Sequence, residues 1–300
     1  MKYEDRRPEI KAREMIVASY PCDGQRHPIL SRMLAAITVM ALFVSTSLMI
    51  ACGAMESAAI VIAGSTSVQP YVEILAEEYT KTHPEMLIDV LGGGSSAGIT
   101  AVESETAGIG MSSRNLKESE QYLWSVEIAK DGLAIIVNPN NPVRDLSLEQ
   151  IRGIYASDII SWGELGGPEA KIHIITREEG SGTRSAFEEM VMDGRRIDPK
   201  AIVQDSNGAV RQLVADDPHS IGFISLGLVD VGERPVKALL IDSAEATSEN
   251  VINGSYTLFR SFLFVALSQP SGPAMEFIEY ILSPEGQRLL AVEGLIPSSY

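Results

Sequence analysis

From Ala59 onward, short β-branched apolar runs alternate with segments of helical periodicity, and this alternation constrains the fold more than any other feature. Residues 58–65 form an apolar run that ends in Gly-Ser, which is typical of a buried strand and its exit turn. Residues 68–84 place apolar side chains near the helical period and end at a proline. This β-α-β order predicts an open, largely parallel α/β sheet.

The alternation begins a second time after a strand and Pro/Asn connector at residues 131–143. Further strands are predicted at residues 86–92, 106–114, 171–178, 201–205, 220–227, 236–242 and 256–268, and helices at residues 97–105, 148–158, 183–193, 207–218 and 272–295. Two series predict two lobes joined by two hinge crossovers. We expect lobe 1 at residues 56–137 plus 257–300 and lobe 2 at residues 138–256, with a ligand cleft between them.

The charge of the chain argues against one broad class of partner. The formal net charge is −16; the first 51 residues hold seven basic and five acidic side chains, which leaves 17 basic and 35 acidic side chains for the remainder. No basic stripe is present, so the sequence does not predict nucleic-acid binding. An anion would have to be captured by local dipoles and a few cations, against the field of the whole protein.

An uncharged apolar segment, Met33 to Met55, is long enough to span a bilayer. One interpretation is a permanent N-terminal transmembrane anchor. The other is a signal sequence at residues 33–51 that is cut before Cys52, because Leu-Met-Ile-Ala-Cys resembles a bacterial lipoprotein signal with a lipid-accepting cysteine. Residues 1–32 are then an N-terminal extension or a mis-assigned start. Both interpretations place the folded part outside the membrane and tethered to it.

Four polar turns share one chemistry, and each stands between an apolar run and an expected helix. They are Gly64-Ser65-Thr66-Ser67, Gly92-Gly93-Gly94-Ser95-Ser96, Ser112-Ser113-Arg114 and Gly180-Ser181-Gly182-Thr183. Each turn alone is explained as a helix N-cap. Four of them at corresponding strand ends, with Arg177 just before the fourth, favour a ligand site.

The residue types in these turns suit a tetrahedral oxyanion. A helix N-terminus offers unpaired N–H groups and a partial positive charge. Glycine lets the backbone approach a ligand closely, and hydroxyl groups add further donors. Arg177 supplies a forked donor pair that matches an oxyanion. The sequence therefore predicts an anion held largely by neutral dipoles.

With these residues assembled, the chain resembles the PstS-type phosphate-binding proteins of ABC-type phosphate importers, from about Ile60 to Tyr300. The segments that carry the resemblance occur in family order: AGSTSVQP, GGGSSAGI, GIGMSSR, DGLAIIVNP, REEGSGTR and SPEGQRLL. The resemblance implies a two-lobed, periplasmic-binding-protein-like fold of type II, in which each lobe is an open, mostly parallel sheet flanked by helices. It also implies a monomeric extracytoplasmic receptor that delivers inorganic phosphate to the permease and ATPase subunits of an importer.

The resemblance assigns phosphate contacts one position at a time. The positions that match the family's ligand contacts are Thr66, Ser67 and Ser95 in lobe 1 and Arg177, Ser181, Gly182 and Thr183 in lobe 2. Glu179, two residues from Arg177 and therefore on the same side of an extended segment, resembles the acid that positions the arginine. Its alternative role is a surface ion pair of little energetic weight.

The third turn departs from the family pattern. Some members carry an aspartate where this chain has Ser113, and that aspartate accepts the proton of a protonated phosphate. A serine can accept or donate, so we expect weaker rejection of sulfate. Arg114 is a further candidate, and it contacts the ligand, pairs with Glu179 across the cleft, or lies in solvent.

The sequence favours holding an anion over reacting with it. None of the four histidines falls in the polar turns, and no His/Cys spacing suggests a metal site. The pattern G-x-S-x-G does not fit around Ser181, no base lies near Ser181 in the sequence, and no G-x-x-x-x-G-K-[ST] loop is present, so neither a nucleophile at Ser181 nor a nucleotide-binding loop is expected. We therefore expect no enzyme and no cofactor. The alternatives are a receptor for sulfate, molybdate or tungstate, a surface phosphatase, and a membrane-anchored structural or sensory module.

Overall fold

The computed structural model describes residues 59–298 except residue 233. The expectations for residues 1–32, for the apolar segment at 33–51 and for Cys52 lie outside the described residues. Residues Glu56–Tyr300 form one compact unit, to which the following description applies. In the described part of this unit, no helix combines the length and the apolar character needed to cross a membrane.

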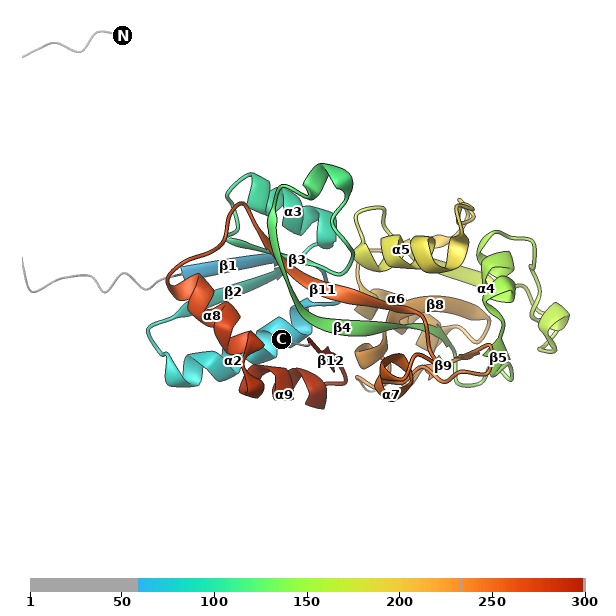
Figure 1. Cartoon of the computed structure of the whole chain (residues 1–300). Helices are drawn as coiled ribbons and strands as arrows, with labels where there is room; N and C mark the ends of the chain where they lie inside the picture. Colours follow the sequence, from blue (N-terminus) through green and yellow to red (C-terminus); the bar gives the residue numbers. More distant parts are fainter. Residues whose placement is uncertain (1–58, 233, 299–300) are drawn as a thin grey trace, which may run out of the picture. The chain divides into compact units, whose positions relative to one another are not determined.

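Strands and helices alternate along the chain as the sequence predicts (Figure 1). The strands are β1 (Ala59–Gly64), β2 (Leu87–Gly92), β3 (Ile109–Ser112), β4 (Trp124–Val137), β5 (Asp145–Leu146), β6 (His173–Arg177), β7 (Ile202–Gln204), β8 (Ser220–Ser225), β9 (Lys237–Ala238), β10 (Leu240–Ile241), β11 (Phe259–Ala266) and β12 (Ile296–Pro297). The α-helices are α2 (Gln69–Thr82), α3 (Ser95–Glu103), α4 (Leu148–Tyr155), α5 (Gly182–Phe187), α6 (Asn207–Asp216), α7 (Ser248–Ile252), α8 (Pro273–Leu282) and α9 (Pro284–Val292).

One sheet runs through both lobes in the order β2-β1-β3-β11-β4-β8-β6-β7. Strands β1, β2 and β3 are parallel in lobe 1, and β6, β7 and β8 are parallel in lobe 2. Strands β11 and β4 are antiparallel to their neighbours and lie between the two parallel sets. Each lobe is therefore mostly parallel, as predicted.

Two hydrophobic cores lie along this sheet. The core of lobe 1 contains buried side chains from β1, α2 and α8, and α3 packs on the other face of the same sheet (Figure 1). The core of lobe 2 contains Trp162, Phe187 and Phe223. The rings of Phe187 and Phe223 stack with their centroids 4.2 Å apart. Strand β4 contributes Ala129 to the first core and Leu133 to the second, so it passes from one lobe to the other. The predicted lobe limits near residues 137 and 257 stay predictions.

Several elements differ from the sequence prediction. Strand β4 begins at Trp124, well before the predicted start at residue 131, because its first half pairs with β11. The predicted last helix is two helices, α8 and α9, since Ser283 is extended and precedes Pro284. The predicted strand at residues 236–242 is split into β9 and β10, which pair with different strands.

Candidate anion-binding site

The three polar turns of lobe 1 form one hydroxyl cluster. Strands β1, β2 and β3 are parallel, so their carboxyl ends lie at the same edge of the sheet. Ser65 Oγ donates to Ser113 Oγ at 2.8 Å, and the Ser113 N–H donates to Ser95 Oγ at 3.0 Å. The sheet therefore joins turns that are far apart in sequence.

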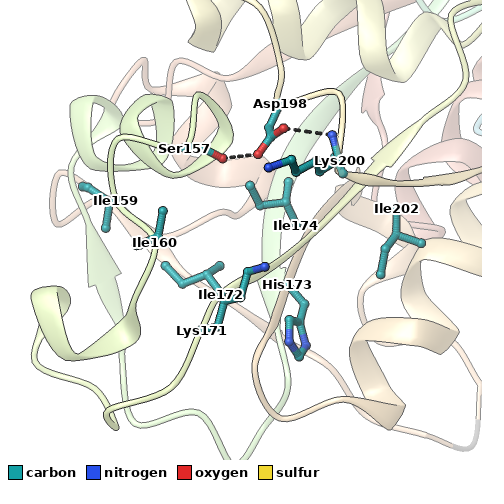
Figure 2. A pocket seen from close by; sticks show the side chains of 11 residues that line it. Ser157, Ile159, Ile160, Lys171, Ile172, His173, Ile174, Asp198, Lys200 and Ile202 are labelled. Carbon is teal, nitrogen blue, oxygen red and sulfur yellow. Dashed lines mark hydrogen bonds between the residues drawn. The ribbon is translucent and has the colours of Figure 1, made fainter.

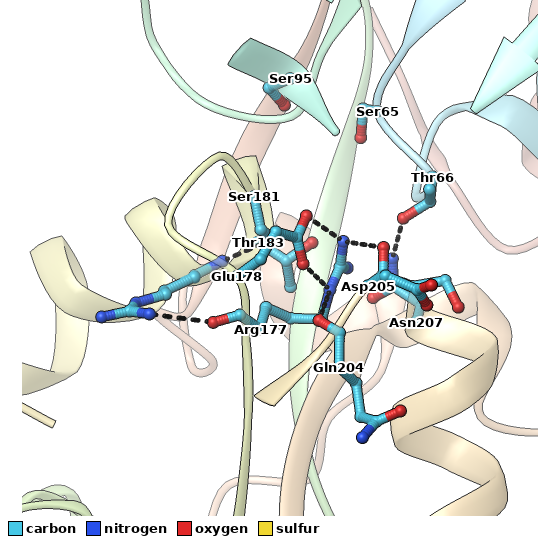
Figure 3. Close-up of polar contacts among 12 residues, drawn as sticks. Ser65, Thr66, Ser95, Arg177, Glu178, Ser181, Thr183, Gln204, Asp205 and Asn207 are labelled. Atoms are coloured by element: carbon cyan, nitrogen blue, oxygen red, sulfur yellow. Dashed lines mark hydrogen bonds and ion pairs between the residues drawn. The ribbon is translucent and has the colours of Figure 1, made fainter. Parts of the chain in front are cut away.

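The fourth turn, which belongs to lobe 2, lies against this cluster. Ser67 Oγ and Thr183 Oγ1 are 2.8 Å apart, and the Ser96 N–H donates to the Gly180 carbonyl at 3.1 Å. In Figure 3, Ser65, Thr66 and Ser95 approach from one side, and Arg177, Ser181 and Thr183 lie on the other. All four predicted turns thus meet between the lobes.

Gly182 makes this close approach of the two lobes geometrically feasible. A Cβ atom at this position would lie 2.2 Å from Ser95 Oγ and 2.6 Å from Ser113 Oγ. Any side chain would therefore push the lobes apart. Next to it, Ser181 caps helix α5, because its Oγ accepts a hydrogen bond from the Arg184 N–H at 3.2 Å.

The hydroxyl of Ser67 is fully engaged by protein partners. Its Oγ accepts hydrogen bonds from Asn207 Nδ2 at 2.8 Å and from Arg260 Nη2 at 3.0 Å. A hydroxyl has two acceptor positions and one proton, so Ser67 must donate to Thr183 Oγ1. Asn207 Nδ2 also donates to Thr66 Oγ1 at 3.3 Å, which links the first turn to helix α6.

Arg177 is fully buried and is held along one edge of its guanidinium. Nε and Nη2 donate to the two carboxylate oxygens of Glu178, both at 2.9 Å, and the same nitrogens donate to the carbonyls of Gln204 and Asp205 (Figure 3). Within the described residues, Arg177 Nη1 is buried and has no hydrogen-bond partner. Such an atom marks a place where an acceptor from outside the protein can bind.

Glu178 and not Glu179 positions Arg177, so the prediction for Glu179 is wrong. Strand β6 ends at Arg177, and the alternation of side chains that would place Glu179 beside the arginine ends with it. Glu179 is exposed on the following turn. The carboxylate of Glu178 instead folds back onto Arg177 and lies against Gly94, where a Cβ would be 3.1 Å from its Oε1.

Arg114 neither lies in solvent nor pairs with Glu179, which are two of the three roles that the sequence suggested. Its side chain is 4% exposed and forms two hydrogen bonds with Glu120, at 2.7 and 2.8 Å. Nη2 also lies 3.5 Å from Ser96 Oγ. This pairing holds the pKa of the Glu120 carboxyl below its usual value. Arg114 therefore anchors the segment after the third turn.

Sequence reasoning missed a further buried ion pair beside the turns. Arg260 on β11 pairs with Asp131 on β4 at 3.0 Å, and Asp131 also accepts from Ser225 Oγ at 2.8 Å. Burial raises the pKa of Asp131 and lowers the pKa of Arg260, while their mutual attraction opposes both shifts. The available signal was a single arginine in the otherwise apolar run YTLFRSFLFVALS.

A surface pocket of about 240 Å³ lies elsewhere on lobe 2 (Figure 2). Its lining includes isoleucines and two exposed lysines, Lys171 and Lys200. Asp198 beside it already accepts hydrogen bonds from Ser157 Oγ and the Lys200 N–H. In the part of the chain that the structure describes, no group of three His, Cys, Asp or Glu residues could hold a metal ion. The converging polar turns are therefore the stronger candidate site.

Comparison with known proteins identifies the family. A model described as a PBP superfamily domain matches residues 52–285. The phosphate-binding protein PstS of Bacillus subtilis is 31% identical over 246 residues, which cover 80% of this chain and 81% of that protein. The chain belongs to the PstS family.

Solved structures agree with this PstS-family assignment. A protein from Clostridium perfringens, solved with bound phosphate, is 41% identical with a TM-score of 0.76, over 80% of this chain and 100% of that chain. An ABC-type phosphate transport receptor from Vibrio cholerae is 39% identical with a TM-score of 0.66, over the same shares of the two chains. The predicted two-lobed binding-protein fold is thereby confirmed.

Proposed function

We propose that this PstS-family chain is an extracytoplasmic receptor that binds inorganic phosphate between its lobes and delivers it to an ABC-type phosphate importer. The observation that carries the proposal is the buried Nη1 of Arg177, which has no partner within the described residues, at the end of the strand that leads into the turn whose Thr183 meets Ser67 of the other lobe. The relatives, which are named phosphate-binding proteins, and the phosphate bound in the Clostridium perfringens structure support the same ligand.

Phosphate is proposed to bind to donors from both lobes at once. The proposed contacts are Thr66, Ser95 and Ser113 from lobe 1, and Arg177, Ser181, Gly182 and Thr183 from lobe 2. Ser67 is proposed as a further contact from lobe 1, which requires that its proton turn from Thr183 Oγ1 to the ligand. Micromolar affinity corresponds to about −8 kcal/mol. Several hydrogen bonds to a charged ligand, each contributing about 1.5–3 kcal/mol, can supply this after the costs of desolvation.

The proposal includes a tether and a membrane partner. We propose that Cys52, which lies outside the described residues, carries a lipid anchor after cleavage of residues 33–51 as a signal sequence; a retained transmembrane anchor is the alternative. The partners are the permease and ATPase subunits of the importer, and the receptor is a monomer. Mass spectrometry of the native N-terminus distinguishes the two anchors, since only the lipoprotein begins at Cys52 with an added lipid mass.

Calorimetry of phosphate binding tests the function directly. Arg177→Ala removes the free Nη1 donor, so we expect phosphate affinity to fall at least tenfold, or by about 1.4 kcal/mol. Arg195→Ala is the control, because this arginine is exposed and its ion pair with Asp158 involves no residue of the turns. Equal affinities for the wild type and Arg177→Ala would remove Arg177 from the site.

A thermal-shift panel of phosphate, sulfate, molybdate and tungstate tests the identity of the ligand, since a ligand raises the stability of the state it binds. We expect the largest shift with phosphate and a measurable one with sulfate, because Ser113 provides no carboxylate. A larger thermal shift with any other anion would mean that this anion, and not phosphate, is the ligand. Turnover of a chromogenic phosphate ester that disappears in Arg177→Ala would instead support a phosphatase.

A further inference from the structure

A second buried arginine beside the proposed phosphate site has a fixed orientation. Arg260 on β11 lies opposite Asp131 on β4, and these strands pass between the two cores. Its Nε and Nη2 both donate to Asp131 Oδ2, at 3.2 and 3.0 Å. Its Cζ lies 5.5 Å from the ring centre of Phe262. The guanidinium is therefore held along one edge and over one face.

This guanidinium also reaches the predicted phosphate contacts. Arg260 Nη2 donates to Ser67 Oγ at 3.0 Å, and Nη1, bonded to the same carbon as Nη2, lies next to that contact. Arg260 Nη1 is buried and has no hydrogen-bond partner among the described residues. A buried donor without an acceptor costs about 1–3 kcal/mol, so proteins rarely retain one without a use for it.

Arg177 shows the same arrangement on the other side of the site. Each arginine pairs its Nε and Nη2 with a carboxylate and keeps Nη1 free of protein partners in the described part of the chain. The two guanidinium groups repel one another. Burial is the main cause that lowers the pKa of Arg260, and the positive charge of Arg177 lowers it further. An anion bound between them relieves this repulsion.

We propose that Arg260 is a second cationic contact of the bound anion, which it binds through Nη1 while Asp131 fixes its orientation. The inference rests on the proposed function. It changes the expected site from one arginine among neutral dipoles to two guanidinium groups, one on a lobe 2 strand end and one on a strand that links the lobes. Ser67 links Arg260 to the fourth turn, since its hydroxyl contacts both Arg260 and Thr183.

Phosphate calorimetry on the full chain with Arg260→Lys tests the inference. Lysine keeps a positive charge beside Asp131 but lacks the forked second donor. We expect phosphate affinity to fall at least tenfold while the unfolding midpoint stays close to that of the wild type. Arg152→Lys is the matched control, because this partly buried arginine pairs with Glu149 on helix α4. It should bind phosphate as the wild type does.

A second variant covers the case in which Arg260→Lys does not fold. Asp131→Asn combined with Arg260→Gln removes both charges together and leaves no unpaired buried ion. The same affinity loss is expected. If the folded variant binds phosphate like the wild type while Arg177→Ala does not, the inference is wrong and the proposed function stands. If the wild type itself binds no phosphate, both the inference and the proposed function fail.

In a phosphate-bound crystal structure, Arg260 Nη1 should lie about 2.7–3.2 Å from a ligand oxygen.

Discussion

The two buried arginines of the site, Arg177 and Arg260, differ in where their carboxylate partners come from. Both use Nε and Nη2 for a carboxylate and keep Nη1 without a protein partner in the described residues. Arg177 pairs with its sequence neighbour Glu178, whose side chain is 31% exposed. Arg260 pairs with Asp131, which is 129 positions away and whose side chain is 0% exposed.

The first ion pair is thus local in the sequence, whereas the second connects two distant segments of the chain. The first pair involves two neighbouring residues, and Arg177 keeps two backbone carbonyls as additional acceptors. The second pair joins β4 to β11 at the level where the chain passes between the lobes, and Arg260 has only Ser67 as another hydrogen-bond partner among the described residues. We therefore expect the first pair to affect binding more than folding, and the second to affect both.

The largest effect is expected on folding, from Asp131→Asn. Removing one member of a buried ion pair leaves the other charge unpaired, which costs about 3–5 kcal/mol. Glu178→Gln should cost clearly less, because Glu178 is partly solvated and Arg177 retains its two carbonyl acceptors. Urea unfolding of both variants gives the two values. Equal costs would mean that the two pairs are energetically alike.

The next effect is expected from Gly182→Ala, which tests whether both arginines serve one site between apposed lobes. The added methyl group would meet Ser95 Oγ at 2.2 Å and Ser113 Oγ at 2.6 Å, so the lobes cannot approach as closely. Phosphate affinity in calorimetry should fall at least tenfold. Gly180→Ala is the control in the same turn, since its nearest neighbour would be Ser96 Cβ at 3.7 Å. Wild-type affinity in Gly182→Ala would contradict a shared site.

The smallest effect is expected from the two neighbouring glutamates. Glu178→Gln weakens the grip on Arg177 without removing the arginine, so phosphate affinity should fall by about threefold to tenfold, or roughly 0.7–1.4 kcal/mol. Glu179→Gln should leave the affinity unchanged, because Glu179 is exposed. Calorimetry on both variants decides which acid positions the arginine. An effect confined to Glu179→Gln would restore the prediction made from the sequence.

Much of the fold could be predicted because it depends on local patterns. Apolar runs and helical periodicity correctly placed β1, α2, β6 and α6, and the polar turns followed from their position after strands. The break between α8 and α9 was also encoded locally, in Ser283-Pro284, but a continuous apolar face concealed it. Strand β4 was underestimated because its first half is stabilised by pairing with β11, a contact between distant segments.

The site was predictable where its chemistry is local and not where it depends on distant contacts. The four turns carry their own signal of glycine and hydroxyl residues. The choice between Glu178 and Glu179 failed because it assumed that the extended backbone continues past Arg177, where β6 ends. The pairing of Arg260 with Asp131 depends on the register of β11 against β4, and no pattern within either segment specifies that register.

The engagement of Ser67 by protein partners has a consequence for the entropy of binding. Arg260 and Asn207 occupy both acceptor positions of its oxygen, so its proton is directed at Thr183 by the fold itself. The proton of Thr183 is then left for another acceptor. The conformational entropy of these side chains is therefore lost when the chain folds and not when the anion binds. The donors that the anion meets have little rotational freedom left to lose.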